Sequence, residues 1–272
     1  MTGPASARSW LFVPGDRPER FGKAAGSGAD AVVCDLEDAV APEHKVAARD
    51  AVRGWLATNP AFVRVNATDT EWHADDLAAL ADVPGLRGLL LPKSEQVDQL
   101  HELARILPER VAVVALVETA LGVHEATSLA RVPGVCRLAF GSLDFALDAG
   151  TGTGQEELRY ARSRLVLSSR VAGIASPVDG VTTDLDDPDR CARDARAARL
   201  LGFGGKLAVH PHQVEVLNQA FLPTAAEVDW ARRVLTAVAE SGTSAVRVDG
   251  QLVDRPRVEL ARGVLAGYEE ER

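Results

Sequence analysis

Eight short apolar runs, each followed by a stretch with helical periodicity, dominate the sequence up to about residue 210. The runs are nearly continuous in apolar residues, which is typical of parallel strands covered on both faces. They are Trp10–Val13, Ala31–Asp35, Phe62–Val65, Gly88–Leu91, Val111–Val117, Arg137–Phe140, Gly180–Thr182 and Lys206–Val209. Eight strand–helix units match the repeat of a (β/α)8 or TIM barrel, so the predicted class is α/β with this barrel.

Helices are predicted between the runs, among them Arg17–Ala25, Glu43–Ala57, Ala74–Ala81, Gln155–Val171 and Pro188–Leu201. A doubly wound open sheet is the alternative, but such a sheet usually has a Gly-rich phosphate loop after its first strand. The residues that follow the first run here, PGDRPER, lack that pattern. The barrel is therefore favoured.

Residues 223–272 do not continue the repeat. An amphipathic helix is predicted over Pro223–Glu240, and alternating residues around Asp249-Gly250 indicate a hairpin. A helix over Pro256–Tyr268 follows. We therefore predict a barrel domain over 1–222 and a helical and hairpin C-terminal extension over 223–272.

Composition excludes several classes of protein. A net charge of −9 argues against a nucleic-acid partner, because phosphate neutralisation needs a basic surface. Cys34, Cys136 and Cys191 form no CxxC pair, which indicates a reducing compartment and no thiolate zinc site. The longest apolar run, Val111–Val117, is far below the roughly 20 residues of a membrane span, and the N-terminus lacks a signal-peptide core. A cytoplasmic location without a membrane partner is expected.

Ionisable residues follow nearly every predicted strand, where TIM-barrel enzymes place their catalytic groups. They are Arg17, Asp35, Glu37, Asp38, Arg64, Lys93, Glu118, Asp144 and His210. Glu118 and Asp144 come from neighbouring strands and would suit Mg²⁺, which takes a few carboxylates and completes its shell with water or substrate oxygens. The same two acids could instead cap the helices that follow them.

Arg64 lies in an otherwise apolar strand, FVRVN, and needs a partner there. That partner could be a resident acid such as Glu37 or a substrate carboxylate, and Lys93 allows the same two interpretations.

The acids Glu37 and Asp38 could also form a salt bridge with Lys45 or Arg49, and from the residues alone this structural role is favoured over direct catalysis. His210 is interpreted by default as a structural histidine.

Eight motifs in order along the chain resemble one family. They are WLFVPGDRPERFGKA, VVCDLEDAVAPEHKVAAR, VRVN, LLLPK, ALVETALG, FGSLDFALDAG, GKLAVHPHQ and DGQLVDRP. Together they resemble the citrate lyase β-subunit-like branch of the HpcH/HpaI aldolase family, which includes malyl-CoA and citramalyl-CoA lyases. One departure is Gly141-Ser142-Leu143-Asp144, where the family often has Gly-x-Glu-Asp.

The resemblance implies a TIM barrel that assembles as a homotrimer or a hexamer, with Mg²⁺ on Glu118 and Asp144. It also implies that Arg64 stabilises the enolate or keto oxygen. Asp254, on the extension, would close over a neighbouring subunit's site as general acid or base, and we count Glu37 with Arg64 and Asp254 as catalytic. The residues expected to bind substrate or CoA are Phe12, Arg17, Lys23, Arg64, Lys93, Glu118, Val209 and His210.

The function expected from the resemblance is Mg²⁺-dependent cleavage or formation of a β-hydroxyacyl-CoA, with a keto acid and an acyl-CoA as the other partners. One alternative is a malate-synthase-like or thioesterase reaction at the same site. Another is the β subunit of a citrate lyase complex that acts on an acyl-carrier thioester.

Overall fold

The computed structural model describes residues 3–241 and 245–269. They divide into two compact units, one up to Asn218 and one from Gln219 onward, and each is described by itself.

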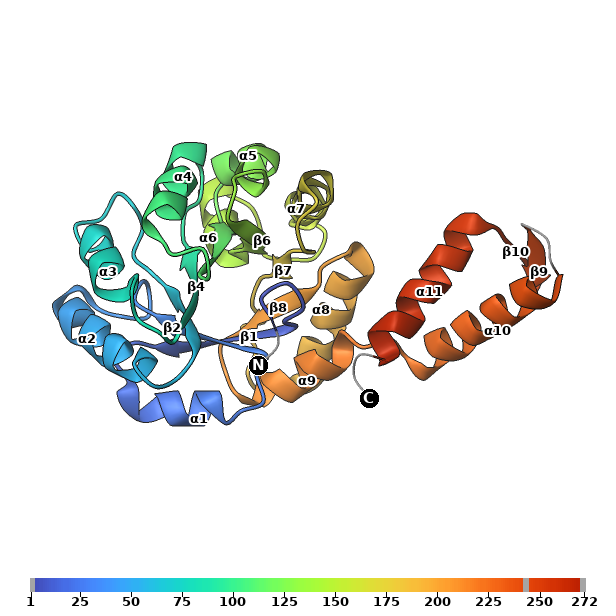
Figure 1. The fold of residues 1–272 in the computed structure, drawn as a ribbon, viewed down its shortest axis with the longest axis horizontal. Helices are drawn as coiled ribbons and strands as arrows, with labels where there is room; N and C mark the ends of the chain where they lie inside the picture. The colour runs from blue at the N-terminus through green and yellow to red at the C-terminus, as the bar shows by residue number, and fades with distance from the viewer. Residues whose placement is uncertain (1–2, 242–244, 270–272) are drawn as a thin grey trace. The chain divides into compact units, whose positions relative to one another are not determined.

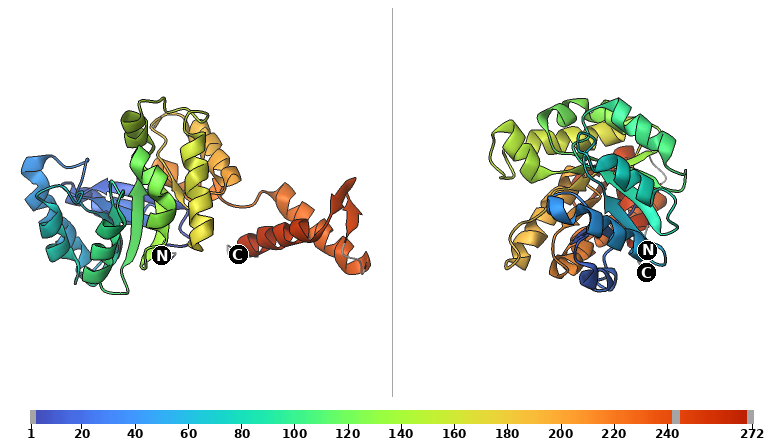
Figure 2. Two further views of the ribbon diagram at one scale, coloured as in Figure 1. Left: turned by 90° about the horizontal axis from the view of Figure 1, so that it is seen from above. Right: turned by 90° about the vertical axis from the view of Figure 1, so that its left-hand side faces the viewer.

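The first unit is a closed barrel of eight parallel strands in sequence order, with helices on the outside of the strands (Figures 1 and 2). Strand β1 pairs in parallel with both β2 and β8, so the sheet has no free edge. The strands are β1 Ser9–Pro14, β2 Ala31–Asp35, β3 Ala61–Arg64, β4 Leu86–Leu91, β5 Ala112–Val117, β6 Val135–Phe140, β7 Val178–Asp179 and β8 Gly205–Ala208. The predicted TIM barrel is confirmed, and the open sheet is excluded.

The helices of this unit alternate with the strands, except that two follow β6. They are α1 Phe21–Ala25, α2 Lys45–Leu56, α3 His73–Leu80, α4 Val97–Ile106, α5 Ala120–Ala130, α6 Ser142–Ala149, α7 Arg159–Ala172, α8 Pro188–Leu201 and α9 His212–Ala220. Short 3-10 turns, η1 Pro18–Arg20 and η2 Pro42–His44, precede α1 and α2, because proline at a first helical position lacks only an N–H that would be unpaired there.

Apolar side chains from all the strands fill the barrel. Trp10 and Phe62 meet at a ring-centroid distance of 4.8 Å, and both are buried. The fully buried guanidinium of Arg137 donates hydrogen bonds to the carbonyls of Pro4, Ala7 and Ser176, which ties the N-terminal segment to β6.

Several predicted boundaries differ from the structure. The seventh strand is Val178–Asp179 rather than Gly180–Thr182, the helix predicted from Gln155 begins at Arg159, and the helix predicted from Arg17 begins at Phe21 after a 3-10 turn. The seventh strand has only two residues and follows Ser176-Pro177, so it leaves no apolar run in the sequence that periodicity could detect. The Asp179 carboxylate is buried because it accepts hydrogen bonds from Arg162 at 3.0 and 3.1 Å and from Lys206 at 3.0 Å.

The second unit pairs helices α10 Ala225–Ser241 and α11 Arg255–Glu269 with a hairpin of β9 Val246–Val248 and β10 Gln251–Val253. The turn residues Asp249 and Gly250 have φ of 52° and 78°, the left-handed values that a tight hairpin turn requires. The unit has its own apolar core, made of Ala231, Val234, Val248, Val253, Val258 and Ala261. The predicted helical and hairpin extension is confirmed.

Within the described part of the chain, none of the helices combines the length and the apolar character needed to cross a membrane.

The Asp179 cluster yields a stability prediction. Asp179→Ala leaves the buried cations of Arg162 and Lys206 without a carboxylate, so the free energy of unfolding should fall by roughly 3–5 kcal/mol. Glu156→Ala is the control, because Glu156 pairs with Arg159 where both side chains are largely exposed. It should cost no more than about 1 kcal/mol. Urea unfolding measures both, and equal losses would contradict the prediction.

Candidate active site

The carboxyl ends of the barrel strands surround a cavity of about 370 Å³. Its floor is mostly apolar, and its polar groups come from β2, β3, β5 and the start of α6. The lining residues are Phe12, Pro14, Asp35, Asp38, Ala39, Arg64, Leu116, Glu118, Phe140, Gly141, Ser142, Leu143, Asp144, Val181, Leu207 and Val209. An apolar cavity with a few convergent charged groups at this end of a barrel is the expected place for chemistry.

Arg64 is the centre of an ion-pair cluster on one side of this cavity. Its Nε and Nη2 donate to the two carboxylate oxygens of Asp35 at 2.8 and 2.7 Å, and its Nη1 lies 2.8 Å from Glu37 Oε2. The guanidinium also stacks on Phe12, 4.9 Å from the ring centroid. Burial lowers the pKa of Arg64, but the carboxylates of Asp35, Glu37 and Asp38 together outweigh that effect and hold the pKa above its ordinary value. Arg64 is therefore a fixed cation.

The predicted salt bridges of Glu37 and Asp38 with Lys45 or Arg49 are wrong. Both acids pair instead with Arg64, Asp38 at 3.5 Å. The Lys45 ammonium donates to the backbone carbonyls of Leu36 and Glu37 at 2.7 and 2.8 Å. Sequence proximity suggested the α2 partners, but a guanidinium on the neighbouring strand lies closer in space.

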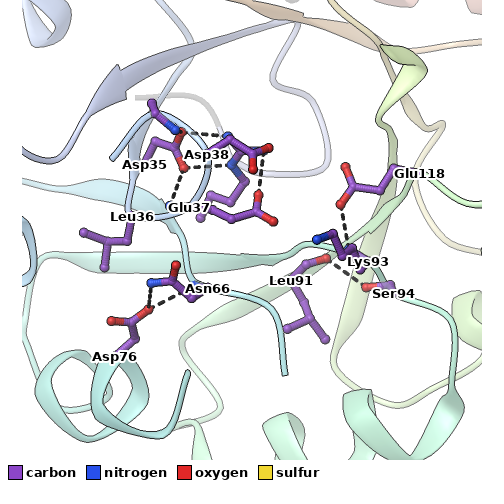
Figure 3. Close-up of polar contacts among 12 residues, drawn as sticks. Asp35, Leu36, Glu37, Asp38, Asn66, Asp76, Leu91, Lys93, Ser94 and Glu118 are labelled. Atoms are coloured by element: carbon purple, nitrogen blue, oxygen red, sulfur yellow. Dashed lines mark hydrogen bonds and ion pairs between the residues drawn. The ribbon is translucent and has the colours of Figure 1, made fainter. Parts of the chain in front are cut away.

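The loop after β2 is built around Asp35. Its carboxylate accepts the backbone N–H groups of Glu37 and Ala39 at 2.9 and 3.2 Å, in addition to the Arg64 bonds (Figure 3). One buried carboxylate therefore fixes both the guanidinium and the loop that carries Glu37. The sequence places Asp35 among the ionisable residues at the strand ends, but it gives no sign that Asp35 is the partner of Arg64.

The loop after β3 is held by a second buried acid. Arg49 donates to Asp76 at 2.8 Å, and Asp76 also accepts the backbone N–H and the side-chain amide of Asn66 (Figure 3). This fixes the backbone two residues beyond Arg64.

Glu37 is 6% exposed. Burial raises its pKa to about 7, although Arg64 opposes the shift.

Glu118 faces the cavity from the end of β5 and is 2% exposed. Its Oε1 accepts the backbone N–H of Lys93 at 2.7 Å (Figure 3). Burial, together with the nearby carboxylates of Glu37 and Asp144, raises the pKa of Glu118 to about 8. A Cβ at Gly141 would collide with Glu118 Oε2, so glycine leaves the space beside that oxygen open.

Asp144, half-buried in the first turn of α6, lines the same cavity as Glu118. These two carboxylates raise each other's energy as anions, and a divalent cation would offset that cost. Among residues 3–241 and 245–269, no group of three or more His, Cys, Asp or Glu side chains is arranged to hold a metal. A pair of carboxylates is nevertheless sufficient for a cation such as Mg²⁺, because this ion fills its remaining positions with water or substrate oxygens.

A second cavity, of about 360 Å³, adjoins the first and shares Phe12, Pro14 and Val209 with it. Its lining residues are Leu11, Phe12, Val13, Pro14, Arg20, Lys23, Ala24, Val209, His210 and Pro211. The pKa of His210 is lowered by burial and then by His212 and Lys23. We call this second cavity the basic cavity, because its ionisable lining residues are Arg20, Lys23 and His210. We call the first one the acidic cavity, because four carboxylates line it.

Arg17 lines neither cavity, and its Nε lies 3.8 Å from Asp16. Arg20, which the sequence analysis did not name, lines the second cavity together with the predicted Lys23.

Three further predicted residues, Glu37, Lys93 and Asp254, lie outside these cavity linings. Glu37 reaches the site through its ion pair with Arg64. Lys93 contributes its backbone N–H to Glu118, and its side chain is exposed. Asp254 belongs to the second unit, where it precedes α11, is half-buried and accepts the backbone N–H of Arg257 at 3.5 Å.

Fold and cavity together define a class: a TIM barrel with a fixed arginine and two carboxylates at its catalytic end. A model of the HpcH/HpaI aldolase/citrate lyase family matches residues 8–211. The chain is 40% identical to the citrate lyase subunit beta-like protein of Deinococcus radiodurans, over 97% of this chain and 98% of that protein. It is 35% identical to a (3S)-malyl-CoA thioesterase of Cereibacter sphaeroides, over 96% and 94%.

A similar solved structure is protein CitE from Mycobacterium tuberculosis in complex with magnesium, acetoacetate and coenzyme A. It has a TM-score of 0.86 and 35% identity, covering 97% of this chain and 98% of that one. The citrate lyase beta subunit of the same organism, complexed with oxaloacetate and magnesium, has a TM-score of 0.71 and 36% identity over 80% and 98%. The chain belongs to the HpcH/HpaI aldolase/citrate lyase family of enzymes.

Lys93 has a φ of 48°, a left-handed conformation that costs a non-glycine residue about 1 kcal/mol. Lys93→Gly should therefore unfold with a free energy about 1 kcal/mol higher than Lys93→Ala. Urea unfolding of the pair measures this. If the Lys93 side chain also binds substrate, both variants should raise KM equally, whereas an unchanged KM would assign the residue to its backbone N–H alone.

Proposed function

We propose that the protein is a Mg²⁺-dependent carbon–carbon lyase that cleaves or forms a β-hydroxyacyl-CoA, of the malyl-CoA or citramalyl-CoA lyase type. The observation that carries the proposal is the buried Glu118 carboxylate, which shares one cavity with Asp144 and Arg64. This combination suits a substrate with adjacent hydroxyl and carboxylate oxygens.

Glu118 and Asp144 would hold the cation. Mg²⁺ supplies Lewis-acid stabilisation of substrate oxygens when bound. Gly141 leaves room beside Glu118 Oε2, and the Lys93 N–H occupies Oε1, so Glu118 offers its second oxygen to the cavity. The solved CitE relatives with magnesium support this assignment.

Arg64 would stabilise the oxygen that becomes the keto group. In the cleavage direction the hydroxyl proton passes to water, the C–O bond becomes a carbonyl and the adjacent C–C bond breaks. Its electrons remain on the acyl-CoA fragment as an enolate. A guanidinium already fixed by Asp35 and Glu37 needs no reorganisation as charge develops on that oxygen.

Asp254 would protonate the enolate, and would remove the same proton in the synthetic direction. We propose that it does so from the second unit of a neighbouring copy in a homotrimer or hexamer. The independent core of residues 219–269, which rigidifies the carboxylate at the start of α11, supports this role.

The basic cavity would receive the CoA part of the substrate. Lys23, Arg20 and His210 line it, and it shares Phe12, Pro14 and Val209 with the acidic cavity. The magnesium, acetoacetate and coenzyme A complex of the CitE relative supports a CoA thioester as substrate.

A second candidate is hydrolysis of the thioester, in a thioesterase or malate-synthase-like reaction at this site. The relative named as a (3S)-malyl-CoA thioesterase favours it, since it spans 96% of this chain.

The two candidates differ in their products. With Mg²⁺ and a panel of malyl-, citramalyl-, citryl- and hydroxymethylglutaryl-CoA, we expect keto acid without free thiol from at least one substrate. The protein's own thiols should contribute little to a thiol assay, because burial raises the pKa of Cys34 to about 12 and of Cys136 to about 11. Free thiol, with or without keto acid, would establish hydrolysis of the thioester instead. Activity only on an acyl-carrier thioester would assign the protein to a citrate lyase complex.

The metal assignment is tested by Glu118→Gln and Asp144→Asn, which remove charge and keep shape. Each should weaken Mn²⁺ binding, measured by electron paramagnetic resonance, by at least about 100-fold. Each should lower kcat/KM with Mg²⁺ by a similar factor. Glu109→Gln, an exposed position before β5, is the matched control and should bind as the wild type does. Full Mn²⁺ affinity in either site variant would refute the assignment.

A further inference from the structure

The acidic and basic cavities meet at a wall made partly by one short loop. We call residues 209–211, between β8 and α9, the dividing loop. Val209 lines both cavities, whereas His210 and Pro211 line only the basic one. A ligand that reaches from one cavity into the other must pass this loop.

A single buried side chain holds the dividing loop. Gln213 is 4% exposed, and its Oε1 accepts the backbone N–H of Val209 at 3.0 Å and that of His210 at 3.3 Å. Its Nε2 donates to the carbonyl of Thr182 at 2.8 Å. Gln213 therefore ties the dividing loop to the loop after β7.

The Thr182 end of this connection is itself anchored. The Thr182 hydroxyl donates to Asp194 of α8 at 3.0 Å, and Asp194 also accepts from the Gln155 amide at 3.0 Å. The dividing loop is thus braced against the α8 side of the barrel. The Arg64 and Glu118 contacts arise from other strand ends and do not involve this brace.

We propose that Gln213 is a positioning residue that sets the passage between the two cavities, and so the fit of a CoA thioester but not of a free keto acid. This inference rests on the proposed function. It predicts that the two kinds of ligand respond differently: loss of the Gln213 amide leaves the part-buried N–H groups of Val209 and His210 unpaired and lets the dividing loop move, while the cluster around Arg64 keeps its geometry.

The test compares Gln213→Met with Gln99→Met. Gln99 makes the same kind of brace elsewhere: its Oε1 accepts the N–H groups of Glu95 and Gln96, and its Nε2 donates to Thr68. It lines neither cavity. Each substitution removes three hydrogen bonds of the same kind, two accepted by the amide oxygen and one donated by the amide nitrogen. Both should lower the midpoint of urea unfolding similarly.

Calorimetry with coenzyme A, and separately with pyruvate plus Mg²⁺, gives the deciding readout. Gln213→Met should weaken coenzyme A binding and raise KM for the thioester by about tenfold, because small misplacements of a positioning element have effects of this order or larger. Pyruvate binding should stay within about twofold of wild type. Gln99→Met should leave both affinities unchanged.

Equal coenzyme A affinity and thioester KM in Gln213→Met and wild type would overturn the inference and leave the proposed function intact. Equal weakening of pyruvate binding would overturn it as well, since the effect would then be general. Wild-type protein that binds no coenzyme A would instead refute the proposed function. If Gln213→Met does not fold, Gln213→Glu keeps an acceptor for the two N–H groups, loses the donor to Thr182 and places a carboxylate oxygen against the Thr182 carbonyl. The same weakening of coenzyme A binding, without weaker pyruvate binding, is expected of it.

Discussion

The pair formed by Arg64 and Asp35 organises the catalytic end of the barrel. A guanidinium at the end of an apolar strand is tolerated only with a carboxylate in hydrogen-bonding geometry, because both charges lose most of their hydration. Asp35 meets that need on the neighbouring strand, and the same oxygens accept two backbone N–H groups of its own loop. The position of the cation and the path of the loop are therefore set together. Glu37 is brought to Arg64 as a consequence.

Elsewhere in the cavity, a backbone N–H rather than an ion pair holds the carboxylate of Glu118. Glu118 is buried without a cation in hydrogen-bonding contact in the described structure, and a single backbone N–H from Lys93 fixes one of its oxygens. That N–H is available because Lys93 adopts a left-handed conformation. Strain in the backbone and the missing Cβ at Gly141 both serve to present one carboxylate oxygen to the cavity. The second oxygen of Glu118 is therefore available to a cation that is not one of the protein's own side chains.

Under the proposed function, the two cavities would receive the two parts of a CoA thioester. The acidic cavity is lined by Arg64, Glu118 and Asp144 among apolar residues, and the basic cavity is lined by Arg20, Lys23 and His210. A barrel accommodates two such cavities readily, because each strand end contributes its own loop and the loops can diverge without disturbing the packed interior.

Periodicity and strand count were enough to specify the barrel and the extension, because a parallel strand buried on both faces must be apolar along its whole length. The position of Glu118 and Asp144 at strand ends was also readable, since strand ends converge in any barrel. The sequence did not decide which charges pair. From the sequence, Arg64 could pair with a substrate carboxylate or with an acid of the protein. In the structure it forms ion pairs with Asp35 and Glu37, whereas Lys45 donates hydrogen bonds to backbone carbonyls. Such choices depend on distances between neighbouring loops, which only tertiary packing sets. For the same reason the sequence did not show that the Asp179 carboxylate pairs with Arg162 of α7 and Lys206 of β8.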